Sequence, residues 1–165
     1  MHSVVHTDPV SALMRVLSER WVMTLALADA QSAAPYPTPL FYALDRSPDP
    51  RLAPRMIFAS APTSHHGILL GAGPTAAAAA VYLETEEAGA IAGAQLRGIV
   101  VRDDHLGDPE AAASMRARYL ARHPQAASVL DAGHQLYALT PTWAKLTDNR
   151  LGFGVHPVVE FDAPF

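Results

Sequence analysis

The chain has 165 residues, which is enough for one domain with a hydrophobic core and too few for two. Hydrophobic residues make up 50% of it and charged residues only 17%, against about 25% in an average protein, so part of the surface is expected to be covered in a homo-oligomer. The net charge of −4, without a basic cluster, argues against a nucleic-acid partner, and the lack of cysteine excludes disulfides, a thiolate nucleophile and a zinc–sulfur site.

The first eight residues lack the basic start and apolar core of a secretory signal peptide. The longest apolar runs, such as Ala76–Leu83, are much shorter than the ~20 residues of a membrane-spanning helix. We therefore expect a cytoplasmic protein with no membrane partner.

The N-terminal part predicts a helix over about residues 8–20. Asp8 is a good N-cap and Pro9 suits the first helical position. Four apolar residues then follow at helical spacing and predict one buried stripe: Ala12, Leu13, Val16 and Leu17.

Two strands joined by a short polar turn are predicted next, over Trp21–Ala28 and Pro37–Leu44. They predict an antiparallel hairpin. Pro37 and Pro39 cannot donate hydrogen bonds to a neighbouring strand, so this end is expected at a sheet edge or beside a ligand.

The segment after a Pro-rich loop predicts a strand, a polar turn and a short helix. Arg55–Ser60 has the apolar alternation of a strand, and Thr63 or Ser64 is a suitable N-cap for a helix that ends before Pro74. Thr75–Glu84 is ambiguous, because its five consecutive alanines favour a helix while its ends and neighbours favour a buried strand. We predict a strand, whose small side chains would let a flat ligand or another backbone come close.

The second half predicts further strands around a helical insertion at about residues 108–131, which includes a short helix at Gln125–Asp131 and contains a His123-Pro124 break. Gly93 and Gly98 are expected to mark bulges or close approaches. The predicted strands are Ile91–Arg102, His134–Thr140 and Thr142–Leu146 with an interruption at Pro141, and Val155–Phe161. Together these elements predict a single domain over residues 1–165, an α+β antiparallel barrel of about six strands.

Ser64, His65 and His66 form the first candidate site. The backbone amides at a helix start lack intrahelical partners and can hold an anion, and two imidazoles can add donors or charge. We therefore predict a site for a cofactor phosphate, although ordinary helix capping explains the same residues.

Gln95 and Arg97 form a second candidate, because their spacing on one strand places both on the same side. They can hold a phosphate and a polar ring edge, or they can be a solvent-facing pair. Trp143 can stack on a ring or fill a core. No Gly-x-Ser-x-Gly elbow, dinucleotide fingerprint or three-ligand metal motif is present in the sequence, so we expect no metal.

Three segments give the chain a resemblance to a known family: Met56–Leu70, Ile91–Val100 and Lys145–Gly154. The order of these pieces resembles the pyridoxamine-5′-phosphate-oxidase-related, FMN-binding split-barrel proteins, and is most similar to a small bacterial branch of unassigned activity. The likeness runs from Trp21 to Gly154 and implies a six-stranded split β-barrel with peripheral helices.

The resemblance also implies a homodimer with FMN in a cleft between the two protomers. Ser64, His65 and His66 match the turn that takes the FMN phosphate, and Gln95 matches a glutamine that reaches the flavin from the partner chain. Thr38, Pro39 and Leu40 are then the backbone contacts of the ring. Arg97 and Trp143, which the residues alone suggest and the resemblance does not assign, are further predicted cofactor-binding residues.

The chain departs from the family pattern in its cations. Both basic positions of the turn are histidine, whose ordinary pKa is about 6.5, and Phe41 and Tyr42 stand where the oxidase itself has phosphate-binding Arg and Lys. If a protonated His65 or His66 holds the phosphate, FMN affinity is expected to fall as the pH rises from about 6 to 8.

The resemblance leads to an FMN-dependent oxidoreductase that acts on an unknown small substrate, with no catalytic residue assigned. The alternatives are a non-catalytic flavin- or haem-binding dimer that acts as a carrier or sensor, and a haem-degrading protein of the same fold.

Overall fold

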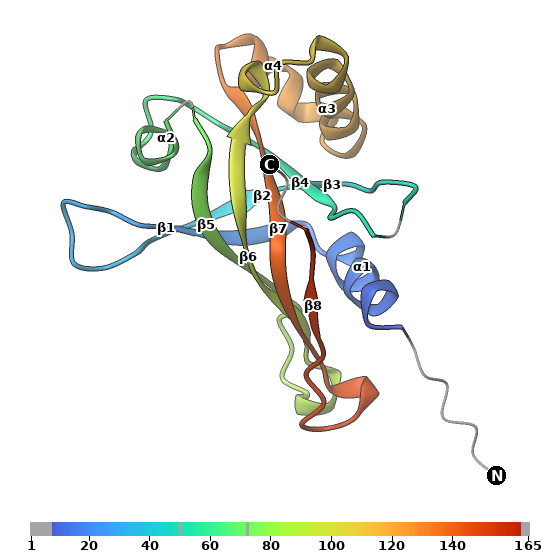
Figure 1. Cartoon of the computed structure of the whole chain (residues 1–165). Helices are drawn as coiled ribbons and strands as arrows, with labels where there is room; N and C mark the ends of the chain where they lie inside the picture. The colour runs from blue at the N-terminus through green and yellow to red at the C-terminus, as the bar shows by residue number, and fades with distance from the viewer. Residues whose placement is uncertain (1–7, 50, 72, 163–165) are drawn as a thin grey trace.

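A computed structural model describes residues 8–49, 51–71 and 73–162. The chain forms one curled β-sheet with helices around it (Figure 1). The strands are β1 (Val22–Leu27), β2 (Tyr36–Phe41), β3 (Ala43–Asp45), β4 (Arg55–Ser60), β5 (Thr75–Tyr82), β6 (Ala92–Arg102), β7 (Gln135–Asp148) and β8 (Val158–Glu160). The α-helices are α1 (Pro9–Glu19), α2 (His65–Leu70), α3 (Pro109–Arg122) and α4 (Ala127–Asp131), with short 3-10 turns η1 (Ala88–Ala90), η2 (Asp103–His105), η3 (Pro124–Ala126) and η4 (Asn149–Leu151).

Neighbouring strands pair in the order β2-β1-β5-β6-β7-β4-β3, always antiparallel, and β8 adds to β7. The α+β class and the antiparallel barrel predicted from the sequence are confirmed. The expected count of six strands is wrong, because seven strands follow one path and a short eighth lies beside it.

Tyr42 divides the predicted strand Pro37–Leu44 into two, which explains one of the extra strands. β2 and β3 flank this residue and lie at the two ends of the sheet path, so the chain passes directly from one end of the sheet to the other. The Tyr42 amide donates to the Trp21 carbonyl (3.1 Å) and its buried hydroxyl donates to the Leu17 carbonyl (2.5 Å). Tyr42 therefore stabilises the point at which the barrel closes, and its hydroxyl connects α1 to the barrel.

The interior of the barrel is the main hydrophobic core. The inward stripe predicted for α1 is confirmed, since Ala12, Leu13, Val16 and Leu17 are all fully buried there. Thr75–Tyr82 is a strand, as predicted, because alternate residues such as Ala79 and Val81 pack into this core between β1 and β6. Tertiary pairing therefore overrides the helix propensity of alanine.

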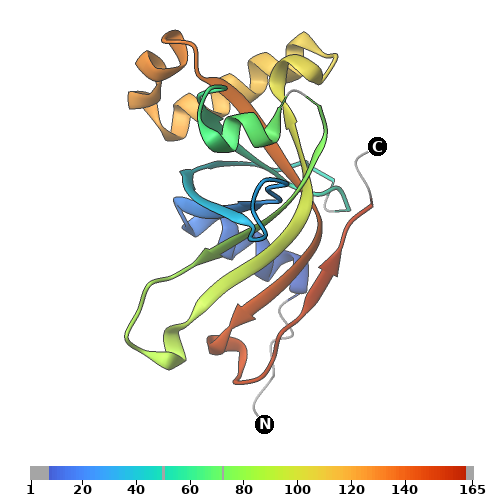
Figure 2. The ribbon, with the colours of Figure 1, turned by 90° about the vertical axis from the view of Figure 1, so that its left-hand side faces the viewer.

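A second core lies outside the barrel, under α3 and α4. Met115 and Tyr119 of α3 pack there against Ile57 of β4 and Ala138 of β7. Figure 2 shows these helices gathered at one end of the sheet, above α2. α3, η3 and α4 lie within the stretch predicted as a helical insertion, and they cover one part of the outer surface of the sheet.

The break predicted at Pro141 is not present, since β7 runs through it. The register with β6 shifts there instead: Gly98 faces Pro141 whereas Arg97 faces Trp143. A Cβ on Gly98 would lie 2.2 Å from the Thr140 carbonyl oxygen, and one on Gly93 would lie 2.5 Å from that of Val81. The predicted close approaches at both glycines are confirmed.

The last strand is also shorter than predicted, with Val158–Glu160 in place of Val155–Phe161. Among the described residues, no helix combines the length and apolar character needed to cross a membrane.

Candidate functional site

The outward faces of β1, β5, β6 and β7 form a shallow groove of 320 Å³. Its lining residues are Thr24, Ala26, Ala78, Ala79, Ala80, Gln95, Leu96, Arg97 and Trp143. The pairing register explains how they meet: Ala80 of β5 lies opposite both Thr24 of β1 and Gln95 of β6. Ala78, the neighbouring residue on the same face of β5, lies opposite Ala26 of β1 and Arg97 of β6. Alternate alanines therefore form a flat floor, with polar side chains along one edge.

Three predicted site residues meet in this groove. Gln95 and Arg97 are both exposed on the same face of β6, as their spacing predicts. The Arg97 guanidinium lies over the Trp143 ring, 4.6 Å from its centroid, in a cation–π contact that holds both side chains at the edge of the alanine floor. The sequence did not show that these two residues contact each other, because they belong to different strands. The groove can accept a flat ring and offer it an amide, a guanidinium and an indole.

Ser64, His65 and His66 lie at a different place, at the start of α2. The Ser64 hydroxyl accepts from the Gly67 amide (3.1 Å) and donates to the Ala61 carbonyl (2.7 Å), which confirms Ser64 as the N-cap. Its oxygen also lies 3.3 Å from Nε2 of His66. In the described part of the chain, the His65 and His66 amides have no hydrogen-bond acceptor. These two amides are the available donors of the turn.

His65 is bound to the tip of the β1–β2 hairpin. Its Nε2 lies 3.0 Å from Oδ2 of Asp29, and its ring meets Tyr36 edge-on at 4.6 Å between centroids. The Gln31 amide, followed by the His65 side chain, lowers the pKa of Asp29, so this carboxylate is ionised at neutral pH. Sequence reasoning missed Asp29 as a partner because it lies 36 residues before His65 and only the folded hairpin brings it near.

His66 is less able to carry charge than an exposed histidine. Burial, and then the neighbouring His65, lower its pKa below the ordinary value of about 6.5. The ring is therefore neutral at pH 7. With His65 paired to a carboxylate, the turn has two free amides but little net positive charge.

The three residues of β2 that were predicted to contact the flavin ring do not all face the same side of the sheet. Pro39 is exposed on the outer face and lies opposite Thr24, in the same row as Ala80 and Gln95. Thr38 is buried and Leu40 packs against the barrel core, so neither side chain faces the groove. The structure thus aligns Pro39 with Gln95, and it leaves Ser64, His65 and His66 in a separate cluster beside the hairpin tip.

No family model and no curated protein matches this sequence. Solved structures do match. A haem-binding protein from Mycobacterium smegmatis superposes with a TM-score of 0.74 at 18% identity, covering 94% of this chain and 59% of that protein. An FAD-binding protein from Mesorhizobium loti gives a TM-score of 0.58 at 16% identity, over 79% of this chain and 86% of that one.

A protein from Clostridium acetobutylicum related to general stress protein 26, of the pyridoxinephosphate oxidase family, gives a TM-score of 0.53 at 10% identity. It matches over 94% of this chain and 98% of its own length. The fold is the pyridoxinephosphate-oxidase-like split barrel. The resemblance drawn from the sequence is confirmed at the level of this split-barrel fold, and this chain spans 59% of the length of the haem-binding split barrel from M. smegmatis.

Proposed function

We propose that this chain is a homodimeric flavin-binding split barrel that works as an FMN-dependent oxidoreductase on a small substrate. The observation that carries the proposal is the convergence of Gln95, Arg97 and Trp143 on one alanine-floored groove. A flat apolar floor with a few convergent polar groups suits a ring such as isoalloxazine. The FAD-binding protein from M. loti and the oxidase-family protein from C. acetobutylicum share the fold and support a flavin as the ligand.

The residues of the groove fit the isoalloxazine ring of FMN better than the residues of the turn before α2 fit its phosphate. Gln95 and Arg97 have exposed polar ends in the groove. Pro39 lies opposite Thr24 and so extends the outer face beyond the edge of the groove. At the predicted phosphate turn, the two free amides fit an anion, but the imidazoles do not supply the expected cations. FMN would therefore be held there by the amides of His65 and His66, and the affinity gained from its phosphate would be modest.

The exposed apolar residues around the groove support the homodimer. Val22, Phe41 and Tyr82 are 40%, 56% and 64% exposed, and each lies on an outward-facing position of the sheet. A second copy on this face would cover them, and it would bring the phosphate turn of one protomer toward the groove of the other. This arrangement would unite the two clusters that lie apart within one chain.

FMN, when bound, accepts a hydride and passes electrons onward. The chain's part would then be to bind and orient the ring: the alanine floor and Trp143 would contact it, and Arg97 would place a positive charge beside it. Among the described residues of one protomer, the lining of the groove includes no Asp, Glu, His or Lys that could act as a general base. A cofactor that needs only a positioned hydride donor is consistent with this lining.

Oxidation of reduced nicotinamide by the FMN-loaded protein tests the activity. With a quinone as acceptor, we expect turnover well above that of free FMN at the same concentration. A rate equal to that of free FMN would contradict the oxidoreductase proposal.

A matched pair of variants tests the dimer. Ala78→Lys places a charge at the centre of the outer face, whereas Ala113→Lys makes the same change on the exposed side of α3. Sedimentation is expected to show a dimer for the wild type and Ala113→Lys and a monomer for Ala78→Lys. A monomeric wild type would refute the dimer.

The alternative function is a non-catalytic carrier or sensor on the same groove. The haem-binding protein from M. smegmatis, which shares the fold, extends this alternative to haem. The described residues of one protomer place no histidine in the groove lining as an axial ligand, so within a single protomer the groove suits a flavin better than a haem. Haem titration without a Soret band, together with FMN binding but no turnover, would select the flavin carrier.

A further inference from the structure

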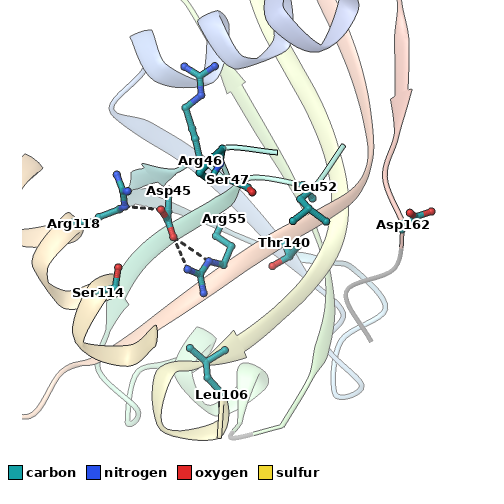
Figure 3. A pocket seen from close by; sticks show the side chains of 12 residues that line it. Asp45, Arg46, Ser47, Leu52, Arg55, Leu106, Ser114, Arg118, Thr140 and Asp162 are labelled. Atoms are coloured by element: carbon teal, nitrogen blue, oxygen red, sulfur yellow. Dashed lines mark hydrogen bonds and ion pairs between the residues drawn. The ribbon is translucent and has the colours of Figure 1, made fainter. Parts of the chain in front are cut away.

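A larger cavity, of 650 Å³, lies between the β3–β4 loop and α3, and it shares no lining residue with the flavin groove. Figure 3 shows its side chains, which come from β3, the β3–β4 loop, β4, the residue after η2, α3, β7 and the segment after β8. The lining residues are Asp45, Arg46, Ser47, Pro48, Leu52, Ala53, Arg55, Leu106, Ser114, Arg118, Thr140 and Asp162. The volume is within the range of about 300–1,000 Å³ typical of small-molecule sites.

A buried carboxylate held by two arginines forms one wall of the cavity. The Asp45 side chain is 10% exposed, and its Oδ2 accepts from Nε (3.1 Å) and Nη2 (2.5 Å) of Arg55. Its other oxygen, Oδ1, lies 2.5 Å from Nε of Arg118 in a second ion pair (Figure 3). One negative charge is thus shared by two guanidinium groups, so the triad keeps a net charge of +1.

The arginines of this triad retain unused donors. Each guanidinium has five N–H groups, whereas Asp45 engages only Nε and Nη2 of Arg55 and only Nε of Arg118. Arg46 lines the same cavity, and within the described ranges its side chain has no ion-pair partner. Among the described lining residues, three arginines stand against two aspartates, Asp45 and Asp162, so the formal charge of this lining is positive.

A second cavity, of 490 Å³, adjoins the first and shares Arg46 and Arg118 with it. It adds Arg122, whose guanidinium lies 4.0 Å from the centroid of the Trp21 ring. Four of the chain's twelve Lys and Arg residues therefore line these two connected hollows, although the protein as a whole carries a net charge of −4. Positive charge concentrated in a concave site attracts anions and favours their entry.

The remaining lining gives the cavity a mixed character. Leu52 and Leu106 lie on either side of Arg55 and Thr140 in Figure 3, and Ser114 and Thr140 add hydroxyl groups. Arginine's planar fork is suited to a carboxylate or a phosphate group. An apolar wall beside the arginines favours a ligand that has a carbon skeleton as well as its charge.

We propose that this cavity is a second ligand site, which binds a small organic oxyanion through the free N–H groups of Arg55 and Arg118, while Arg46 adds positive charge at its edge beside α1. The carbon skeleton of the ligand packs against Leu52 and Leu106. The charged group is a carboxylate or a phosphate monoester, since the same guanidinium donors serve both. The site is separate from the flavin groove and does not depend on a bound flavin.

Calorimetric titration with three probes tests the proposal: phenyl phosphate, benzoate and inorganic phosphate. Phenyl phosphate or benzoate is expected to bind at least tenfold more tightly than inorganic phosphate, which cannot use the apolar wall. The stronger of the two organic probes identifies the charged group. If neither organic probe binds more tightly than inorganic phosphate, the proposal is overturned.

Substitution of single arginines tests whether the ligand binds in this cavity. Arg118→Gln leaves Asp45 paired with Arg55, so this variant is expected to fold and to weaken binding at least tenfold. Arg116→Gln is the matched control, because Arg116 is also half-exposed on α3 but pairs with Asp131 at 2.8 Å, away from the cavity. Equal affinity in Arg118→Gln and the wild type would refute the proposed site.

Amide shifts in a ¹H–¹⁵N spectrum separate this proposal from the flavin proposal. Phenyl phosphate is expected to move the amides of Leu106, Ser114 and Thr140, both with and without FMN. Shifts confined to residues 64–67 would mean that the probe occupies the phosphate turn instead, and would overturn the second site while leaving the flavin proposal intact.

Discussion

Asp148 is expected to contribute about 2 kcal/mol to the stability of the fold, which the variant Asp148→Asn will measure. Its side chain has no exposed surface and accepts from Nε (2.8 Å) and Nη2 (2.7 Å) of Arg150, the Arg150 amide (3.1 Å) and Nη2 of Arg15 (3.2 Å). The carboxylate thereby joins α1, the end of β7 and the turn η4. An asparagine of the same shape would lose the charge and turn an N–H donor toward guanidinium groups that also donate.

The size of the expected stability loss in Asp148→Asn follows from how exposed the two arginine partners of Asp148 are. Breaking a fully buried ion pair costs about 3–5 kcal/mol, whereas an exposed pair contributes about 0–1 kcal/mol. Asp148 is buried, but Arg15 and Arg150 are 42% and 45% exposed, so solvent screens the interaction and a value between these limits applies. Urea unfolding at pH 7, at one protein concentration, gives the difference in the free energy of unfolding.

Asp104→Asn is the matched control. Asp104 also accepts from Nε and Nη2 of one arginine, Arg102, at 2.6 and 2.8 Å, but its side chain is 49% exposed. The control is expected to lose at most about 0.5 kcal/mol. Equal losses in the two variants would refute the argument that burial gives the Asp148 contacts their strength.

The pH dependence of the same variant provides an independent check. The Arg150 side chain lowers the pKa of Asp148 in the folded protein below its ordinary value. The contribution of this carboxylate is therefore complete above the unfolded pKa of about 3.9 and is lost as the pH falls through the lower folded pKa. The stability difference between wild type and Asp148→Asn should stay constant from pH 7 to 5 and shrink only below about pH 4. A difference that shrinks between pH 7 and 5 would contradict this assignment.

Three further changes have defined outcomes. Tyr42→Phe removes the hydroxyl that satisfies the Leu17 carbonyl, so urea unfolding should show a loss of about 1–2 kcal/mol; no loss would contradict the closing role of this residue. Gly67→Ala would place a Cβ 2.2 Å from the Ala61 carbonyl oxygen, so it should cost about 1–3 kcal/mol by displacing α2 even though alanine favours helices; a more stable variant would refute this. Because burial lowers the pKa of His66 below its ordinary value of about 6.5, FMN affinities of wild type and His66→Gln should agree from pH 7 to 8 and separate only at lower pH; a difference at pH 8 would contradict this, because it would show that the neutral ring contributes to binding.

Local sequence signals predicted those elements that depend on neighbouring residues. Asp8 and Pro9 define the start of α1, and the Ser64 cap defines α2, because capping acts over three or four residues. The same-side placement of Gln95 and Arg97 followed from strand periodicity alone.

Features that depend on long-range contacts were not predictable in this way. The division of one expected strand at Tyr42 requires the Leu17 carbonyl, and the Asp29–His65 pair requires the folded hairpin. Strand β7 passes through Pro141 because the register with β6 shifts at Gly98, which no local pattern records. The arginine-lined cavity joins the β3–β4 loop to α3, two segments far apart in the sequence, so it became visible only in the folded chain.

Titration of the purified protein with FMN, followed by the visible absorption of the flavin, tests the central claim most directly. We predict saturable binding with a shifted flavin spectrum for the wild type and Ala113→Lys, and loss of binding for Ala78→Lys, whose side chain would fill the groove. An unchanged spectrum of FMN in the presence of excess wild-type protein, or full binding by Ala78→Lys, would contradict the claim that the alanine-floored groove holds a flavin.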